Sequence, residues 1–412
     1  MSDPEVRTVA EAAQVNFQVG GTVEPGFERV RDAFAQAQAR DRGGAQLFVY
    51  HLGRPVVNLW AGRDPLNNRA YDEGSIAVLM SCTKAAVATC AHMLAERGQL
   101  DIDARVADYW PEFARNGKAG VRVRHLLAHS AGLMGFEPES GIGAAEIFDW
   151  RRCVAALEDM APLWPPGEAY FYHPVTFGVL VGEVIRRVSG RTVGRFFADE
   201  VAGPLGLDLW IGLPEDQEHR FAPHFSASPS PPIEVSRALL AQAGVDVGSR
   251  LARTILHTLS TTEEAIALMG SSRDARAVEV PAGNGVGDAR SLARMYAALI
   301  GEVDGVRLIG PETLQSACAP QLDGMGPPAE LAVFAPDRGQ NSGLGFGLPW
   351  VLTPMLGPGS FGHSGAGGRL GFALPGLGVS VGYVCNTMIN SPTEPDPRWV
   401  GWTRALHEAL GA

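Results

Sequence analysis

Strand patterns lie near the two ends of this chain, and helical patterns fill the long middle. Residues 45–51 and 55–61 are β-rich runs around Leu52-Gly53-Arg54, which predicts a hairpin. Near the other end, glycines separate β-rich runs at 343–351, 360–363, 369–374 and 378–386. Strands from both ends of a chain, with helices between them, favour one antiparallel sheet built from both termini.

Helical periodicity accounts for most of the remaining chain. We expect helices at 27–40, 81–97, 123–129, 144–160, 176–188, 192–201, 236–243, 248–259, 289–300, 313–317 and 399–410. Residues 226–232 and 324–342 contain clusters of Pro, Gly or Ser and are expected to be connections. The sequence therefore predicts an α/β (α+β) fold. In it, residues 1–89 and 286–412 form an antiparallel sheet flanked by helices, and residues 90–285 form an inserted all-helical domain.

Charge and hydropathy bear on partners and location. The chain of 412 residues has a formal net charge of −11, which argues against nucleic acid or an anionic membrane as a partner. No uninterrupted apolar run reaches the length that crosses a bilayer. Residues 1–21 lack a basic segment followed by an apolar core, so we expect no signal peptide. Five widely spaced cysteines indicate free thiols, which together with these features predict a cytoplasmic protein.

The residues most indicative of chemistry are Ser81 and Lys84. They stand three positions apart at the head of an Ala-rich stretch that runs to Arg97 and stops at Gly98. On a helix, positions i and i+3 share a face, so the hydroxyl of Ser81 and the amine of Lys84 can meet. A serine hydroxyl is a weak nucleophile until a neighbouring base takes its proton, and this pairing supplies one.

The stretch around Lys84 is apolar nearly all round, which indicates a buried helix. Burial removes water from a lysine and favours the neutral amine, which is a usable base. The first turn of the helix also offers free backbone N–H groups to a developing oxyanion. A Ser-x-x-Lys string is short and occurs by chance, but the chain has only two lysines, Lys84 and Lys118, beside thirty-two arginines. That scarcity favours catalysis over coincidence.

Two later stretches complete a pattern. Residues 166–174 contain Tyr170 and Tyr172 before a predicted helix, and residues 361–368 read Phe-Gly-His-Ser-Gly-Ala-Gly-Gly at a strand end. Together with Ser81-Cys82-Thr83-Lys84, this order resembles the serine β-lactamase and penicillin-binding-protein superfamily. The closer resemblance is to its class C branch and to the β-lactamase-like family VIII carboxylesterases. It spans roughly residue 27 to the C-terminus, with support from residues 100–106 and 124–133.

The resemblance implies a role for each matched residue. Ser81 would be acylated, and Lys84 and Tyr172 would form the base pair, with Tyr172 passing the proton to the leaving group. The backbone N–H groups of Ser81 and Ala366 would form the oxyanion hole. If Lys84 is charged, it lowers the pKa of the Tyr172 phenol, which is then the base. If Lys84 is neutral, it is itself the base. The sequence leaves both alternatives open. The substrate-binding residues would be His363, Ser364, Gly365 and Ala366.

Two positions depart from the lactamase pattern. Class C enzymes have Tyr-x-Asn where this chain has Tyr172-His173-Pro174, so the amide that contacts a substrate's acylamino group is missing. They have Lys-Thr-Gly where this chain has His363-Ser364-Gly365, and a mostly neutral His is a weaker partner for the carboxylate of a β-lactam. Both departures favour esters over β-lactams.

Neighbouring residues offer alternatives to this assignment. Tyr170 is the alternative to Tyr172, with Tyr172 favoured. Cys82 is a possible nucleophile beside Ser81, but it points to a different face of the helix from Lys84, so we expect it to pack in the core. His125 and His129 have the i, i+4 spacing of zinc ligands, but no Glu, Asp or Cys accompanies them in a metal pattern. We therefore expect no metal and no other cofactor.

The sequence thus predicts a serine hydrolase that cleaves small to medium carboxylic esters through an acyl-Ser81 intermediate. Its partner would be a small-molecule ester. One alternative is an acyltransferase of the same superfamily. Another is a β-lactamase, or a penicillin-binding protein that is acylated without turnover. The natural ester, its acyl length and the oligomeric state are not specified by the sequence.

Overall fold

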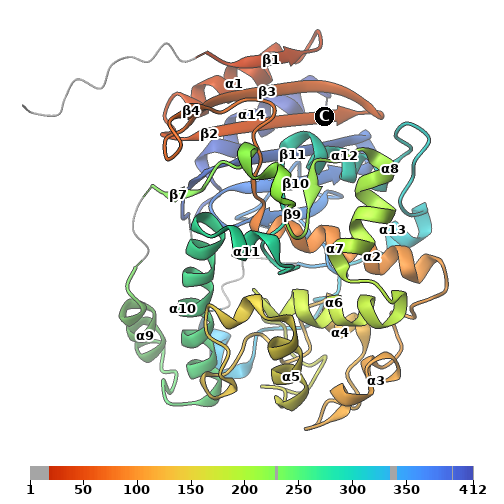
Figure 1. The fold of residues 1–412 in the computed structure, drawn as a ribbon, viewed down its shortest axis with the longest axis vertical. Coiled ribbons are helices and arrows are strands. Elements are labelled where there is room, and N and C mark those ends of the chain that lie inside the picture. The colour runs from red at the N-terminus through yellow and green to blue at the C-terminus, as the bar shows by residue number, and fades with distance from the viewer. Residues whose placement is uncertain (1–17, 228–230, 335–340, 392, 412) are drawn as a thin grey trace, which may run out of the picture.

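Strands from both ends of the chain meet in one antiparallel sheet (Figure 1). The computed structural model describes residues 18–227, 231–334, 341–391 and 393–411. Within them the sheet runs in the order β1-β3-β2-β11-β10-β9, and the short β4 pairs with β3. The strands are β1 (Gly20–Val23), β2 (Gly44–His51), β3 (Arg54–Asp64), β4 (Arg69–Ala70), β9 (Phe361–Gly365), β10 (Arg369–Leu374) and β11 (Val379–Cys385). The pairing of β2 with β11 joins the two ends of the chain, which confirms the predicted sheet.

Helices cover both faces of this sheet, so its central strands β2, β10 and β11 are buried on both sides. Successive side chains of a strand point to opposite faces. Leu47 and Val49 of β2 belong to the core under α1 (Glu28–Gln38) and α14 (Pro397–Ala409). Phe48 and Tyr50 belong to the core on the other face, with α12 (Ala289–Ile300).

Glycines in the central strands let α12 lie close to the sheet. A Cβ atom on Gly382 of β11 would lie 2.1 Å from the carbonyl oxygen of Ala289. One on Gly371 of β10 would lie 2.7 Å from the ring of Tyr296. Ser380 donates a hydrogen bond to the carbonyl of Ala293 across the same interface (2.8 Å). Close packing of α12 therefore requires small residues where it crosses β10 and β11.

The middle of the chain forms a helical layer below the sheet, with α2 between the two (Figure 1). Every residue of α2 (Thr83–Glu96) from Thr83 to Leu94 is buried, which confirms the predicted buried helix. The other helices are α3 (Val106–Tyr109), α4 (Val123–Leu127), α5 (Trp150–Asp159), α6 (Thr176–Ser189), α7 (Val193–Phe197), α8 (Gly203–Leu205), α9 (Ile233–Gln242), α10 (Arg250–Ser271), α11 (Arg273–Ala277) and α13 (Pro311–Ala317). None of the described helices is both long enough and apolar enough to span a membrane.

Short strands also occur in the middle of the chain, where only helices were predicted. β6 (Leu209–Trp210) and β5 (Ala77–Val78) both pair with β8 (Val286–Gly287). β7 (Phe225–Ser226) pairs in parallel with β12 (Thr387–Met388). Two-residue strands carry too little alternation to be read from a sequence. The predicted division at residues 89 and 286 stays a prediction.

One predicted strand is wrong. Residues 343–351 form only isolated bridges, from Gly347 to Ser342 and to Gly362, and from Trp350 to Thr353. Gly345 has φ +86, in the left-handed region, which ends an extended strand. A Cβ atom on Gly345 would lie 2.5 Å from the Cβ of Ala88, so the segment turns there to pack on α2. β1 went unpredicted because it is four residues long and begins with two glycines.

Helix bounds differ from the prediction where a cap decides them. The predicted helix at 144–160 begins only at Trp150, because the side chain of Asp149 accepts a hydrogen bond from the N–H of Arg152 (3.1 Å). The helix predicted at 192–201 passes into a π turn, Ala198–Ala202. α10 continues well beyond the predicted residue 259. Some predictions fall on residues outside the described ranges. These are residues 1–17, where we expect no signal peptide, and parts of the connections predicted at 226–232 and 324–342.

Candidate active site

Ser81 lies at the junction of a short strand and a buried helix. From β5 the chain enters a 3-10 turn, Met80–Cys82, that continues directly into α2. The N–H of Leu79 donates to the carbonyl of Gly285, the residue just before β8 (2.7 Å). Met80 has φ +51, which is uncommon for a residue with a side chain and typical of functional sites. The turn leaves Ser81 partly exposed, while Met80 and Cys82 are buried.

Lys84 lies behind Ser81 and is fully buried. Its Nζ is 3.2 Å from Ser81 Oγ, and it donates to the carbonyl oxygens of Pro174 and Ala282 at 2.8 Å each. Lys84 makes no ion pair with a carboxylate among the described residues. Burial lowers the pKa of Lys84 to about 7. A large fraction of the amine is therefore neutral at neutral pH.

The two carbonyl partners of Lys84 fix how a neutral amine is oriented. A carbonyl oxygen only accepts hydrogen bonds, so Pro174 and Ala282 take both N–H groups of a neutral amine. The remaining tetrahedral position, which holds the lone pair, then faces Ser81 Oγ. In this form the hydroxyl of Ser81 donates to Lys84, which is the arrangement that a general base needs.

Tyr172 lies beside both Ser81 and Lys84, in the segment before α6. Its phenol is hydrogen-bonded to Ser81, and its ring centroid is 4.9 Å from Lys84 Nζ. Burial raises the pKa of Tyr172, and the contact with Ser81 lowers it by less. Tyr172 is therefore protonated at neutral pH and suited to donate a proton rather than to take one. Tyr170 lines the same cavity, with its ring edge-on to His129 at 6.1 Å.

The end of β9 lies directly against the Ser81 turn. A Cβ atom on Gly365 would lie 2.4 Å from the carbonyl oxygen of Leu79, so only glycine permits this approach. The next residue, Ala366, is exposed in the turn between β9 and β10. The thiol of Cys82 donates to the carbonyl of His363 (3.1 Å), which ties β9 to the same turn. Burial raises the pKa of that thiol to about 12, in keeping with a packing role for Cys82.

His363 faces the site as a neutral side chain. Its Nδ1 lies 2.7 Å from the carbonyl oxygen of Ser364, so Nδ1 carries the hydrogen and Nε2 is an acceptor. Burial, and to a lesser degree the amine of Lys84, lowers the pKa of His363 to about 3. Its ring is 6.1 Å from that of Tyr172. At neutral pH His363 thus supplies no positive charge for a carboxylate.

A cavity of about 370 Å³ opens onto Ser81, and we call it the Ser81 cavity. The predicted residues that line it are Ser81, Tyr172, His363, Ser364 and Ala366. Gly365 lies beneath the lining. His129, Phe346 and Trp350 also line the cavity and were not assigned to the site from the sequence. The last two lie in the segment misread as a strand, so no sequence signal placed them here.

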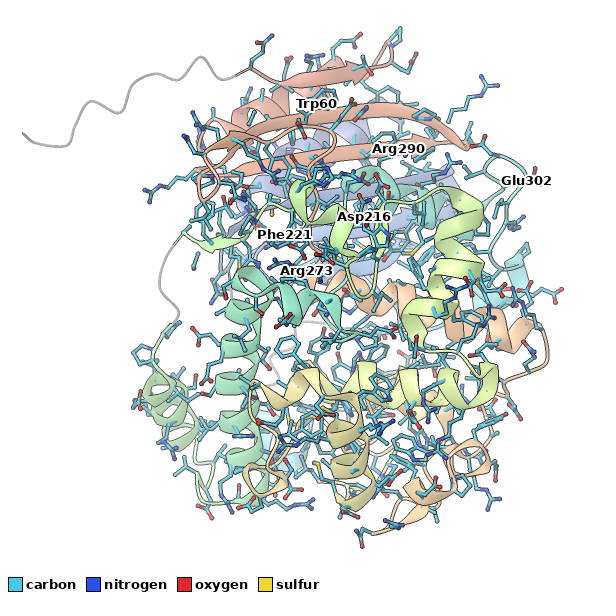
Figure 2. The ribbon with its side chains drawn as sticks, in the orientation of Figure 1. Trp60, Asp216, Phe221, Arg273, Arg290 and Glu302 are labelled. Atoms are coloured by element: carbon cyan, nitrogen blue, oxygen red, sulfur yellow. The ribbon has the colours of Figure 1, made fainter. Side chains whose placement is uncertain are left out.

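A second, larger cavity of about 940 Å³ also borders Ala366, and we call it the α10 groove. It lies between α10, the start of α9 and the β7–β12 pair. Its apolar lining includes Leu66, Phe225, Ile233, Leu259, Ile266 and Met388. Pro174 and Ala366 border it, whereas Tyr172 does not. A third cavity, of about 500 Å³, is lined in part by Arg290, which Figure 2 labels. Its lining includes none of the predicted site residues.

The two histidines with zinc-like spacing each use a ring nitrogen on the backbone. His125 Nδ1 accepts from the N–H of Arg122 (3.2 Å), and His129 Nδ1 accepts from the N–H of His173 (3.1 Å). His129 is buried, has φ +57, and stacks on Phe177 at 4.9 Å between ring centroids. The contacts of His129 hold the segment that carries Tyr172, while the contact of His125 caps α4, so both histidines have structural roles. Within the described ranges, no three His, Cys, Asp or Glu side chains are grouped as metal ligands would be.

Known proteins share both the sequence and the shape of this chain. The family model described as Beta-lactamase matches residues 30–402. "Esterase/beta-lactamase LipL" of Mycobacterium tuberculosis is 33% identical over 391 residues, which cover 90% of this chain and 84% of that one. A solved family VIII carboxylesterase is 32% identical with a TM-score of 0.78, and the match covers 95% of this chain and all of the other. A penicillin-binding protein homologue from Caulobacter crescentus is 34% identical with a TM-score of 0.80, at the same coverage.

Proposed function

The chain belongs to the beta-lactamase family, and from that premise we propose that it hydrolyses small to medium carboxylic esters through an acyl-Ser81 intermediate. The observation that carries this proposal is the contact of Ser81 with a buried Lys84, whose pKa burial lowers to about 7. The esterase relatives support the substrate class: besides LipL, "Esterase EstB" of Burkholderia gladioli is 28% identical over 200 residues, 44% of this chain and 48% of that one.

Acylation begins when Lys84 takes the proton of Ser81 and Oγ attacks the ester carbonyl. The carbonyl oxygen gains negative charge and is held by the N–H groups of Ser81 and Ala366. When the tetrahedral intermediate collapses, the ester C–O bond breaks and Tyr172 gives its proton to the leaving alcohol. Lys84 restores that proton to Tyr172. Water, activated by the same base, then releases the acid and Ser81.

Substrate choice follows from the two departures from the lactamase pattern. Pro174 offers no side-chain hydrogen bond to an acylamino group, and its carbonyl is already bound to Lys84. His363 is neutral, so it gives a carboxylate no charge-assisted hydrogen bond. A simple ester contains neither group. The site therefore favours esters over β-lactams.

The two cavities divide the ester between them. The proton donor to the leaving alcohol must lie on the alcohol's side of Ser81. Tyr172 lines the Ser81 cavity and not the α10 groove, so the alcohol occupies the Ser81 cavity. The acyl chain then enters the apolar α10 groove past Ala366. Esters of an apolar acyl group with a small alcohol fit this arrangement.

Turnover of p-nitrophenyl acetate tests the proposal. Steady hydrolysis that is lost in Ser81→Ala is the expected result. A single stoichiometric release of p-nitrophenol without turnover would instead indicate a penicillin-binding protein. Faster release on addition of alcohols, with ester as the product, would indicate an acyltransferase. The proposed chemistry uses side chains, backbone N–H groups and water. We propose a cytoplasmic location because the five cysteines are free thiols.

A further inference from the structure

Arg369, the first residue of β10, is a fully buried guanidinium. Its Nε donates to the carbonyl of Val78 (3.1 Å) and its Nη1 to the carbonyl of Ala366 (3.0 Å). Its Nη2 is buried and has no hydrogen-bond partner among the described residues. No described carboxylate forms an ion pair with it. The other strongly buried arginine of this region, Arg398, forms ion pairs with two carboxylates, Asp41 and Asp396.

Two thiols and a phenol that interact with Arg369 supply no negative charge at neutral pH. Burial raises the pKa of the Cys82 thiol to about 12, and it also raises the pKa values of Tyr71 and Cys385. An arginine keeps its proton in proteins. Arg369 is thus a buried cation that forms no ion pair with a described carboxylate, because its neighbours Asp41 and Asp396 are bound to Arg398. An unpaired buried charge is an arrangement that folding alone disfavours. Local violations of this kind are characteristic of functional sites.

Arg369 fastens together the two segments that hold the candidate oxyanion donors. Val78 lies three residues before Ser81 and leads into its turn, while Ala366 follows β9. Opposite Arg369 in the β9–β10 pairing stands Gly365, where an added Cβ would lie 3.1 Å from the Cβ of Arg369. One guanidinium therefore sets the spacing of the Ser81 turn from the Ala366 turn.

We propose that Arg369 is a positioning residue of the oxyanion hole, and that its charge, which no carboxylate contacts directly, stabilises the transient oxyanion. The inference rests on the proposed function, because it requires that Ser81 and Ala366 bind a developing oxyanion. Arg369 exchanges no proton with the substrate. Its positive charge and its two carbonyl bonds act most strongly when the ester oxygen becomes negative, so they stabilise the transition state more than the bound ester.

The variants Arg369→Gln and Arg369→Lys test this with two readouts. The first is kcat and KM for p-nitrophenyl acetate. The second is the affinity of phenylboronic acid, which adds to a serine as a tetrahedral anion. Arg369→Gln is expected to lower kcat about 100-fold, with KM changed less than about threefold, and to weaken boronate binding by a similar factor. Arg369→Lys keeps the positive charge but not the hydrogen bonds to both carbonyl oxygens. It is expected to lose about tenfold in kcat and about tenfold in boronate affinity.

Arg187→Gln is the control, since Arg187 is half-buried and paired with Glu183 and Glu112 away from the site. It is expected to lower the melting temperature and leave kcat and boronate binding unchanged. Wild-type kcat in Arg369→Lys, or a loss of kcat without a matching loss of boronate affinity, would overturn the inference. The lysine variant decides the matter even where the glutamine variant does not fold. A wild-type protein that turns over no ester would overturn the proposed function as well, so the two failures are distinguishable.

Discussion

The amine of Lys84 lies 3.2 Å from the hydroxyl of Ser81, and its two other hydrogen bonds go to carbonyl oxygens, those of Pro174 and Ala282. Neither partner can donate, so a neutral amine has only its lone pair left for Ser81. Burial brings the pKa of Lys84 down to about 7, which makes that neutral form abundant at working pH. The sequence left open whether Lys84 or the phenol is the base, and these contacts favour Lys84.

The first prediction is the acidic limb of the pH profile. Because the neutral amine is the active base, kcat/KM for a neutral ester should be level above about pH 7 and fall about tenfold per pH unit below it. Lys118 is the matched control, since its pKa is also lowered, to about 8, but it binds the carbonyls of Glu158 and Met160. Lys118→Met should leave the limb in place. A limb above pH 10 would instead indicate a phenolate base, because burial raises the pKa of Tyr172.

The second prediction concerns the relay between Lys84 and Tyr172. Each single variant, Lys84→Ala and Tyr172→Phe, should lose about 10²- to 10⁴-fold in kcat. Because both act on one proton path, the double variant should be hardly worse than the more damaging single one. Losses that multiply would show two independent roles. Tyr170→Phe is the matched control and should cost little; a loss as large as that of Tyr172→Phe would move the role to Tyr170.

The third prediction is a preference for esters over β-lactams. A charge-assisted hydrogen bond is worth about 1.5–3 kcal/mol, and the neutral His363 forgoes it with a lactam carboxylate. Pro174 also lacks the side-chain amide that would bind the acylamino group of a lactam. Together the two missing interactions amount to several kcal/mol, on the order of a thousandfold in kcat/KM. The measurement compares p-nitrophenyl acetate with nitrocefin and benzylpenicillin at pH 7. Equal values would contradict it. His363→Lys should raise lactam turnover relative to ester turnover.

The fourth prediction concerns the α10 groove. Burying one methylene is worth about 0.8 kcal/mol, so kcat/KM should rise about fourfold per acyl carbon as p-nitrophenyl esters lengthen from acetate. Ala267 of α10 lines the groove, and Ala267→Trp should abolish this rise while leaving acetate within about threefold. Ala241 of α9 is exposed and does not line the groove, so Ala241→Trp is the control. A rise that persists in Ala267→Trp would place the acyl chain elsewhere.

Local patterns explain what the sequence predicted correctly. The sheet followed from β-rich runs at the two ends, and α2 followed from its apolar residues. Ser81 and Lys84 are three residues apart, so helix geometry alone brings them together. By contrast, Tyr172 and His363 are far from Ser81 in sequence, and only the resemblance to a family joined them to it. The structure places both on the Ser81 cavity, while their catalytic and binding roles stay predictions.

What the sequence missed depends on contacts between distant segments. Residues 343–351 have a strand-like composition, but the close approach of Gly345 to Ala88 turns the chain there and puts Trp350 into the cavity. The α10 groove arises from how α10 lies against β7 and β12, which no periodicity specifies. Arg369 reads as an ordinary surface charge in the sequence. Its isolation from carboxylates appears only when Val78 and Ala366 are placed beside it.

The most direct test of the account is to identify the residue that a serine-reactive phosphonate modifies. The account predicts a single adduct on Ser81, found by peptide mass spectrometry, with complete loss of ester hydrolysis at the same stoichiometry. Ser81→Ala should take up no phosphonate and lose several orders of magnitude in rate. An adduct on Ser130 or Ser364, or undiminished hydrolysis in Ser81→Ala, would contradict the assignment of Ser81 as the nucleophile.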